Sequence, residues 1–171
     1  VVIDTGTYGG STVTIGLADQ GAAYAGSPAG SNFNFGGTRF ELTDSDFNLI
    51  YGLRFTGNGG TGVYIHGSGS FYSDSNVVRD NTFTCTSSTG IRVDNGVNTL
   101  LDGNTMAGTG TLAIDLNAPT SVTVRGNTVS GWGIGMQIND TGALVIENND
   151  LSGTSRSVEL NSAGVVTIRG N

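Results

Sequence analysis

The sequence predicts an all-β fold in which short strands wind into a parallel β-solenoid of about seven coils. Three observations support this prediction: a composition dominated by small residues, a repeat of 22 to 23 residues, and a regular spacing of apolar residues within the repeat. Gly, Thr, Ser and Asn occur 29, 22, 16 and 16 times among the 171 residues. This composition alone would suit a disordered chain. The regular spacing of the apolar residues indicates a folded repeat instead.

The repeat is centred on an asparagine. The spacings are 23, 23, 22 and 22 residues between Asn81, Asn104, Asn127, Asn149 and Asn171. A short alternation of apolar and polar residues lies on each side of this asparagine, and a third follows nine or ten residues later. The pattern predicts three short strands per coil, with each coil about 4.8 Å above the previous one. The coils are 22 to 28 residues long, and residues 1–171 are expected to form a single domain.

Stacking the coils in this register predicts apolar columns that form the core. The strand before the asparagine contributes Ile50, Val78, Leu101, Val124, Ile146 and Ile168. The strand after it contributes Phe55, Phe83, Met106, Val129 and Leu151. The third strand contributes two columns, which are Val63, Ile91, Ile114, Met136 and Val158, and Ile65, Val93, Leu116, Ile138 and Leu160.

Two polar columns accompany the core. The asparagines are expected to form a ladder, in which each side-chain amide hydrogen-bonds to the amides above and below it. Two residues earlier, an outward column changes its charge from coil to coil, and it consists of Tyr51, Arg79, Asp102, Arg125, Glu147 and Arg169. Opposite charges one strand spacing apart predict cross-strand ion pairs of about 0.2 to 1 kcal/mol each rather than a binding patch.

These features resemble the right-handed, single-stranded parallel β-helix of the pectin-lyase-like superfamily, over nearly the whole chain. The segment Asn48-Leu-Ile-Tyr-Gly-Leu-Arg-Phe-Thr-Gly57 is similar to the alginate-lyase and chondroitinase-B type of polysaccharide lyase. In this superfamily the substrate groove usually runs along the sheet that here contains the third strand of each coil. The resemblance therefore implies a groove lined by the outward column Glu41, Tyr64, Arg92, Asp115, Gln137 and Glu159, with His66, Asp94, Asn117, Asn139 and Asn161 at the following turn.

One coil is longer than the others. The step from Leu53 to Asn81 is 28 residues, and the five extra residues fall within the segment from His66 to Ser75. A longer loop here would overhang the groove and bring Phe71 and Tyr72 near His66 and Arg92. Functional residues concentrate in loops that interrupt a rigid scaffold, so this loop is a candidate part of a site. The alternative is a tolerated insertion whose two aromatic rings pack on the rod.

The groove offers candidate residues for two reactions. A glycoside hydrolase needs two carboxylates about 5 to 9 Å apart, and Asp94 and Asp115 lie in adjacent coils of the predicted face. A polysaccharide lyase needs a base, often a lysine in the enzymes resembled here, and this chain has no lysine. His66 has a side chain that titrates near neutral pH, whereas the Arg92 guanidinium hardly ever deprotonates. The alternative is that Asp94 and Asp115 are solvated surface side chains and that His66 is simply hydrogen-bonded at a turn.

The side chains expected to bind substrate are Tyr64, Phe71, Tyr72, Gln137 and Glu159. No cofactor is expected, because one histidine and one cysteine cannot make a conventional zinc site. The segment from Asp44 to Asn48 starts like a calcium loop, but Leu49 stands where the loop needs glycine. A looser calcium site stays open as an alternative.

Composition and charge narrow the class of partner. All seven basic residues are arginines and the net charge is −7, which argues against nucleic acid and anionic membranes because both need a basic surface. No apolar run approaches the roughly 20 residues of a membrane span.

The two ends of the chain lack a helical, charged cap. We therefore expect either that the chain is part of a longer polypeptide or that copies stack end to end into filaments. The predicted function is an extracellular or cell-surface module with a structural, adhesive or glycan-binding role, whose partner is a polysaccharide or a second copy. The alternative is a lyase or glycoside hydrolase acting on an acidic polysaccharide.

Overall fold

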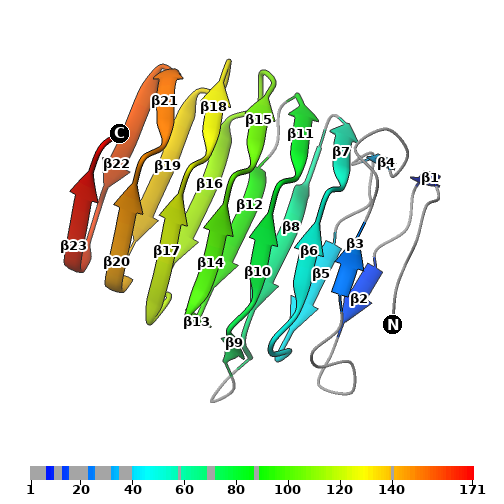
Figure 1. The fold of residues 1–171 in the computed structure, drawn as a ribbon, viewed down its shortest axis with the longest axis horizontal. Coiled ribbons are helices and arrows are strands. Elements are labelled where there is room, and N and C mark those ends of the chain that lie inside the picture. Colours follow the sequence, from blue (N-terminus) through cyan, green and yellow to red (C-terminus); the bar gives the residue numbers. More distant parts are fainter. Residues whose placement is uncertain are drawn as a thin grey trace.

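The computed structural model describes residues 40–57, 59–68, 72–86, 89–139 and 141–171, together with four short strands nearer the N-terminus. Three parallel sheets of seven strands each form an elongated stack (Figure 1). Sheet A consists of β1 (Thr7–Gly9), β4 (Asn32–Asn34), β7 (Arg54–Gly57), β11 (Thr82–Cys85), β15 (Thr105–Ala107), β18 (Thr128–Ser130) and β21 (Asp150–Gly153). Sheet B consists of β2 (Val13–Ile15), β5 (Phe40–Thr43), β8 (Thr61–His66), β12 (Thr89–Asp94), β16 (Leu112–Asn117), β19 (Ile134–Asn139) and β22 (Arg156–Leu160). Sheet C consists of β3 (Ala23–Ala25), β6 (Leu49–Tyr51), β10 (Val77–Arg79), β14 (Thr99–Asp102), β17 (Ser121–Arg125), β20 (Thr141–Glu147) and β23 (Ala163–Arg169).

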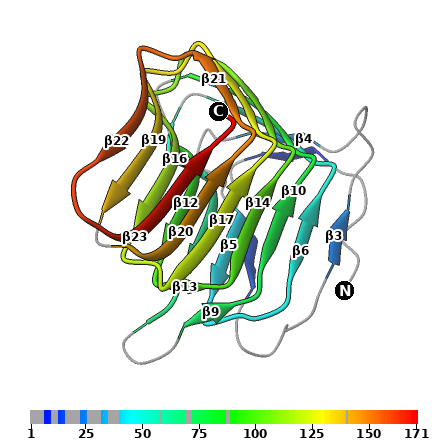
Figure 2. The same cartoon turned by 60° about the vertical axis from the view of Figure 1, so that its left-hand side comes forward.

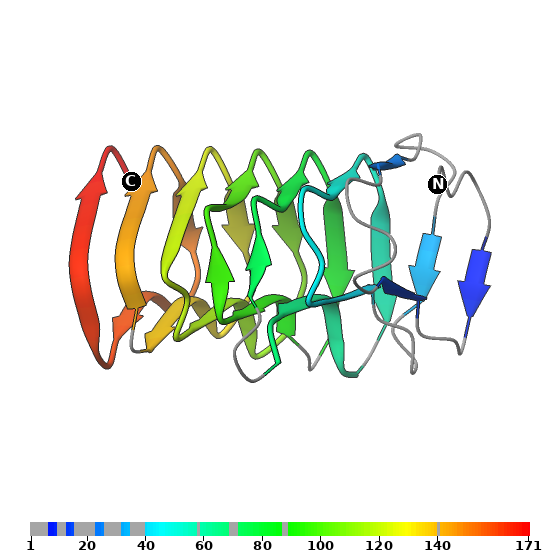
Figure 3. The same cartoon turned by 90° about the horizontal axis from the view of Figure 1, so that it is seen from below.

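The chain passes from sheet C to sheet A to sheet B in each coil, so the prediction of three strands per coil is confirmed. The three sheets enclose a common interior (Figure 2), and the coils follow one another along the stack (Figure 3). A small additional pair joins β9 (Ser73–Asp74) to β13 (Gly96–Val97) at the corner between sheets B and C. No helix occurs among the described residues, and so none that could span a membrane.

The predicted apolar columns form the core. Every predicted member from Ile50 to Ile146 is buried in the described structure, and Phe55 stacks on Phe83 with ring centroids 4.6 Å apart. The last coil differs, since Leu160 and Ile168 are 49% and 48% exposed. The core also contains Trp132, which the column pattern did not predict and which is almost fully buried.

The asparagine ladder is confirmed. The Nδ2 group of each asparagine donates to the Oδ1 atom of the next, over 3.0 Å from Asn81 to Asn104, 3.0 Å from Asn104 to Asn127, 2.9 Å from Asn127 to Asn149 and 2.8 Å from Asn149 to Asn171. The ladder lies between sheets C and A and is buried from Asn81 to Asn149. Its side-chain oxygens also accept hydrogen bonds from the backbone N–H groups of Asn81, Asn104 and Asn127, so these donors at the bend between two strands are satisfied.

A second, shorter amide ladder was not predicted. It lies at the corner between sheets B and C, where Asn48 Nδ2 donates to Asn76 Oδ1 over 3.0 Å. Asn76 in turn donates to the Ser45 carbonyl over 2.7 Å. Thr99 follows in the next coil, and its buried hydroxyl has no hydrogen-bond partner among the described residues.

Two of the predicted cross-strand charge pairs form. Arg125 bonds Asp102 over 3.1 Å, and Arg169 contacts Glu147 over 2.5 Å. The guanidinium of Arg79 lies 5.1 Å from the centre of the Tyr51 ring. These are surface contacts, so each contributes about 1 kcal/mol or less.

The long coil has its insertion where it was predicted. His66 is in register with Asp94, and Ser73 is in register with Gly96, so the extra residues lie between His66 and Ser73. Phe71 lies outside the described residues. Tyr72 is described and is 51% exposed.

The segment that begins like a calcium loop makes protein contacts. Asp44 Oδ1 accepts a bond from the Ser68 backbone N–H over 2.6 Å, and its other oxygen accepts one from the Ser68 hydroxyl. Asp46 accepts a bond from the backbone of Asp74 over 2.7 Å. In the described part of the chain, no group of three or more His, Cys, Asp or Glu side chains is arranged to hold a metal ion.

Candidate functional site

The predicted groove column lies on the outer face of sheet B. The strand register places Tyr64 beside Glu41 on one side and beside Arg92 on the other, and Asp115 follows Arg92. Gln137 and Glu159 continue the same row. The side chains of β8, β12 and β16 point alternately into the core and out of it, because the side-chain period of a strand is two. The structure therefore places Tyr64, Arg92 and Asp115 side by side in one row, as the repeat predicted.

Arg92 is the centre of this cluster. Its Nε atom lies 2.9 and 3.0 Å from the two oxygens of Asp94, and its Nη2 atom lies 2.8 Å from Asp94 Oδ2. Asp115 Oδ2 approaches the same Nε atom at 3.7 Å. The bond to Asp94 raises the pKa of Arg92, so this guanidinium is always charged.

Tyr64 closes the other side of Asp94. Its hydroxyl donates to Asp94 Oδ2 over 2.7 Å, and the Arg92 guanidinium lies 5.4 Å from the centre of its ring. Burial, together with the bond to Asp94 and the charge of that carboxylate, raises the pKa of Tyr64 to about 12. The phenol is therefore protonated at any physiological pH.

His66 joins the cluster from the end of β8. Its ring stacks on Tyr64 with centroids 4.3 Å apart and an interplanar angle of 17°. Its Nε2 atom lies 2.9 Å from Glu41 Oε1 and 2.9 Å from Thr43 Oγ1. Glu41 and Thr43 belong to the preceding coil, and the sequence analysis did not name them as partners of His66.

Asp115 is the second carboxylate beside Arg92. Burial raises its pKa, the charge of Asp94 acts in the same direction, and Arg92 opposes both. Asp94 and Asp115 therefore have different surroundings, since Asp94 accepts bonds from both Tyr64 and Arg92. Two carboxyl groups in unlike environments are a known basis for dividing acid and base roles.

The remaining predicted residues lie outside this cluster. Gln137 stands one coil beyond Asp115, and Glu159 one coil further. Glu159 pairs with Arg156, whose Nη1 atom lies 2.9 Å from Glu159 Oε2. Tyr72 lies on the segment that leads into β9, and its role stays a prediction.

Comparison with known proteins agrees with the observed fold. A family model described as the right handed beta helix region matches residues 29–171. The chain belongs to this β-helix family. No curated protein and no solved structure matches the chain. The predicted right-handed parallel β-helix is therefore confirmed, whereas the likeness to alginate-lyase and chondroitinase-B enzymes stays a prediction.

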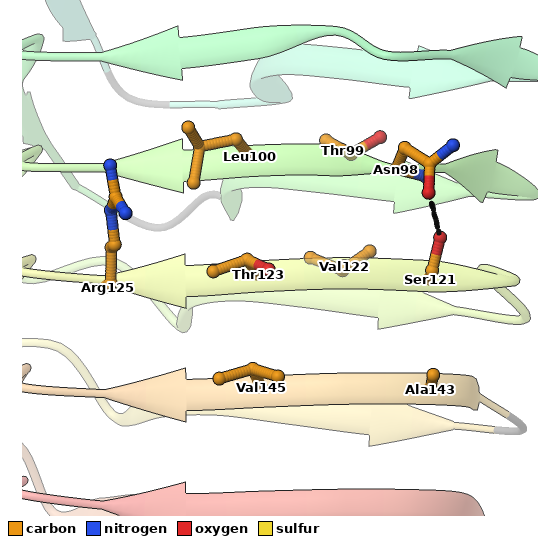
Figure 4. A pocket seen from close by; sticks show the side chains of 9 residues that line it. All are labelled: Asn98, Thr99, Leu100, Ser121, Val122, Thr123, Arg125, Ala143 and Val145. Carbon is orange, nitrogen blue, oxygen red and sulfur yellow. Dashed lines mark hydrogen bonds between the residues drawn. The ribbon is translucent and has the colours of Figure 1, made fainter.

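The β-helix also has a shallow hollow that was not predicted, on the outer face of sheet C (Figure 4). Its volume is about 390 Å³. The side chains around it come from β14, β17 and β20 and the residues just before β14, and they are Asn98, Thr99, Leu100, Ser121, Val122, Thr123, Arg125, Ala143 and Val145. The signal that could have revealed it is the outward column Leu49, Val77, Leu100, Thr123 and Val145, which is largely apolar although it faces solvent.

Proposed function

We propose that this chain is a non-catalytic β-helix module that binds a neutral polysaccharide along the outer face of sheet B, outside the cell or at its surface. The observation that supports it best is the straight row of side chains from Glu41 to Glu159, which repeats once per coil. Carboxylate, phenol and amide groups in such a row offer donors and acceptors to the hydroxyls of a linear polymer lying along the rod.

The charge of this face favours a neutral ligand. Glu41, Asp94, Asp115 and Glu159 contribute four carboxylates, and the chain as a whole has a net charge of −7. Arg92, the basic residue in the centre of the row, is already bonded to Asp94. An acidic polysaccharide would therefore meet like charge, which costs affinity.

The internal bonds of the cluster favour binding over elimination chemistry. A lyase needs a group that accepts a proton at neutral pH. The Tyr64 phenol donates its proton to Asp94 and has a pKa of about 12, and His66 is engaged by Glu41 and Thr43. The same bonds hold the side chains in fixed positions, which lowers the entropy cost of binding a ligand.

One observation favours glycoside hydrolysis as a second candidate function. Asp94 and Asp115 both approach the Nε atom of Arg92, at 2.9 and 3.7 Å, and burial raises the pKa of Asp115. In that case Asp115 would be the general acid, because burial favours its protonated form, and Asp94 would be the second carboxylate.

The test is binding and turnover on a panel of neutral and acidic soluble polysaccharides. We expect retarded migration of the protein in gels that contain a neutral polysaccharide, and a loss of about tenfold or more in affinity for Gln137→Ala, whose side chain lies on the binding row. The matched control is Thr105→Ala on the outer face of sheet A, which should bind normally. New reducing ends that disappear in Asp115→Asn would establish the hydrolase instead. Absence of binding to every neutral polymer would overturn the proposal.

A further inference from the structure

The outer face of sheet C presents three parallel columns along the rod. The middle column is largely apolar, and it consists of Leu49, Val77, Leu100, Thr123, Val145 and Thr167. The column on one side has the alternating charges, from Tyr51 and Arg79 through Asp102, Arg125 and Glu147 to Arg169. The column on the other side begins with Phe47 and ends with Val165.

Two large apolar residues of this face are exposed, Phe47 just before β6 and Val165 in the last strand, β23. Phe47 is 61% exposed and Val165 is 74% exposed. Phe47 also has a left-handed backbone with φ of 59°, a conformation that is strained for a bulky residue. The same position two coils later holds Asn98, and asparagine adopts this conformation more readily than phenylalanine does. The backbone N–H of Phe47 donates to the Asp74 carbonyl over 2.8 Å, so the backbone of this corner is fixed while the phenyl ring stays exposed.

We propose that sheet C packs against sheet C of a second copy to form a symmetric dimer. The two rods run antiparallel, and the two-fold axis lies parallel to the strands and passes between β14 and β17. This operation reverses the order of the coils and lays each column on the same column of the other copy. It therefore places β6 opposite β23, β10 opposite β20, and β14 opposite β17.

The charged column becomes complementary to itself under this operation. Asp102 faces Arg125 of the other copy, Arg79 faces Glu147, and the Tyr51 ring faces the Arg169 guanidinium. Each facing pair occurs twice because of the symmetry. An axis that passed through a strand would instead place like charges opposite each other, such as Arg125 on Arg125. The alternation of sign therefore selects an axis between two coils.

The apolar residues fit the same arrangement. Leu100 lies over the smaller Thr123 of the other copy, at the hollow of about 390 Å³ that Thr123 helps to line. Val77 meets Val145. The two most exposed large apolar side chains of the face, Phe47 and Val165, cover each other. Figure 4 shows the Leu100 side and the Val145 side of this hollow with Thr123 between them.

The size of the face predicts a weak dimer. The proposed axis matches six of the seven strands of sheet C, β6 to β23. Six strands about 4.8 Å apart, with about five residues each at about 3.3 Å, give roughly 400 to 500 Å² per copy. The total of roughly 800 to 1,000 Å² is at the lower limit for specific interfaces. We therefore expect a weak dimer whose population depends on protein concentration.

Charge exchange tests the axis directly. In sedimentation velocity over a concentration series, the unmodified protein should convert from monomer to dimer. Asp102→Arg and Arg125→Glu should each remain monomeric, because each places two pairs of like charges across the axis. An equimolar mixture of the two variants should dimerise again. In the mixed dimer, the new arginine of Asp102→Arg faces the new glutamate of Arg125→Glu. The unmodified Arg125 of the first variant also faces the unmodified Asp102 of the second. An unmodified protein that stays monomeric, or a mixture that does not recover, would overturn the proposal.

A second variant covers the case in which the charge variants fail to fold. Phe47→Asn places at this corner the residue that Asn98 supplies in a later coil, so it should relieve backbone strain and raise the melting temperature. The same variant should weaken the dimer about fivefold or more, because it removes the contact with Val165. Weakened dimerisation in a more stable protein supports the interface, whereas unchanged dimerisation would refute it.

Discussion

Replacing Asn104 by alanine should destabilise the β-helix more than any single polar substitution on its surface. The Asn104 side chain is fully buried and makes four hydrogen bonds. It donates to the Val78 carbonyl over 2.9 Å and to Asn127 over 3.0 Å, and it accepts from the Asn81 backbone and side chain over 3.1 and 3.0 Å. Two of the partners keep another bond, since Asn127 Oδ1 still accepts from the Asn104 backbone and Asn81 Nδ2 still donates to the Ile50 carbonyl. The buried Asn81 N–H loses this acceptor altogether.

The magnitude follows from these partners. Each lost bond is worth about 0.5 to 1.5 kcal/mol, and a buried donor left without a partner costs about 1 to 3 kcal/mol. We therefore expect a loss of about 3 to 5 kcal/mol in the free energy of unfolding. The measurement is urea unfolding followed by circular dichroism, with hydrogen exchange at the ladder amides as a local probe.

The matched control for Asn104 is Asn161→Ala. Asn161 is exposed, and its side chain makes one bond, to Asn139 Oδ1 over 2.7 Å. This control should lose less than about 1 kcal/mol. If both variants lost the same amount, the buried ladder could not be the source of the stability that we assign to it.

Three further predictions concern the core corner and the cluster on sheet B. Gly110→Ala should cost about 1 to 3 kcal/mol, because a Cβ atom would overlap the buried Trp132 ring, whereas Gly59→Ala, with open space around it, should be nearly neutral in the same melting experiment. Burial raises the pKa of Asp115, so the contribution of this side chain to stability is complete below the unfolded carboxyl pKa of about 4 and is lost as the pH rises through the folded pKa. Asp115→Asn should therefore flatten this part of the curve of melting temperature against pH. An unchanged curve would contradict the raised pKa. Ultraviolet titration should show a tyrosine that ionises near pH 12 and is missing in Tyr64→Phe, and equal curves for the two proteins would argue against the bond to Asp94.

Much of the fold follows from the repeat because stacking turns sequence spacing directly into contact. The 28-residue step to Asn81 predicted both the register of Leu53 with Asn81 and the place of the insertion, and the Leu53 N–H indeed bonds Asn81 Oδ1 over 2.9 Å. The sequence did not predict Trp132 or the Asn48–Asn76 pair, because neither of them repeats from coil to coil. A residue that occurs once, or a pair that Thr99 interrupts, leaves no period in the sequence.

The candidate site was predictable in its positions but not in its bonds. The period of the repeat placed Tyr64, Arg92 and Asp115 in one row. Which carboxylate Arg92 bonds depends on side-chain rotamers, since both Asp94 and Asp115 lie close to its guanidinium, at 2.8 and 3.7 Å. Because Arg92 bonds Asp94 directly and Asp115 at a longer distance, the two carboxylates acquire different surroundings. Spacing alone does not contain that difference.

The two proposed surfaces occupy different faces of the same rod, and this has a consequence for binding. Sheet B and sheet C are separate sides of the coil (Figure 2), so a dimer that covers sheet C leaves the row from Glu41 to Glu159 open in both copies. Two weak sites joined in one particle bind a long polymer with an avidity that exceeds either single site, by up to about 10² to 10⁴ where the geometry permits both to engage. The interface variants Asp102→Arg and Phe47→Asn should therefore weaken retention on a long polysaccharide while leaving the affinity for a short oligosaccharide unchanged. Equal losses for both ligands would mean that these substitutions disturb sheet B itself, and the two surfaces would not be independent.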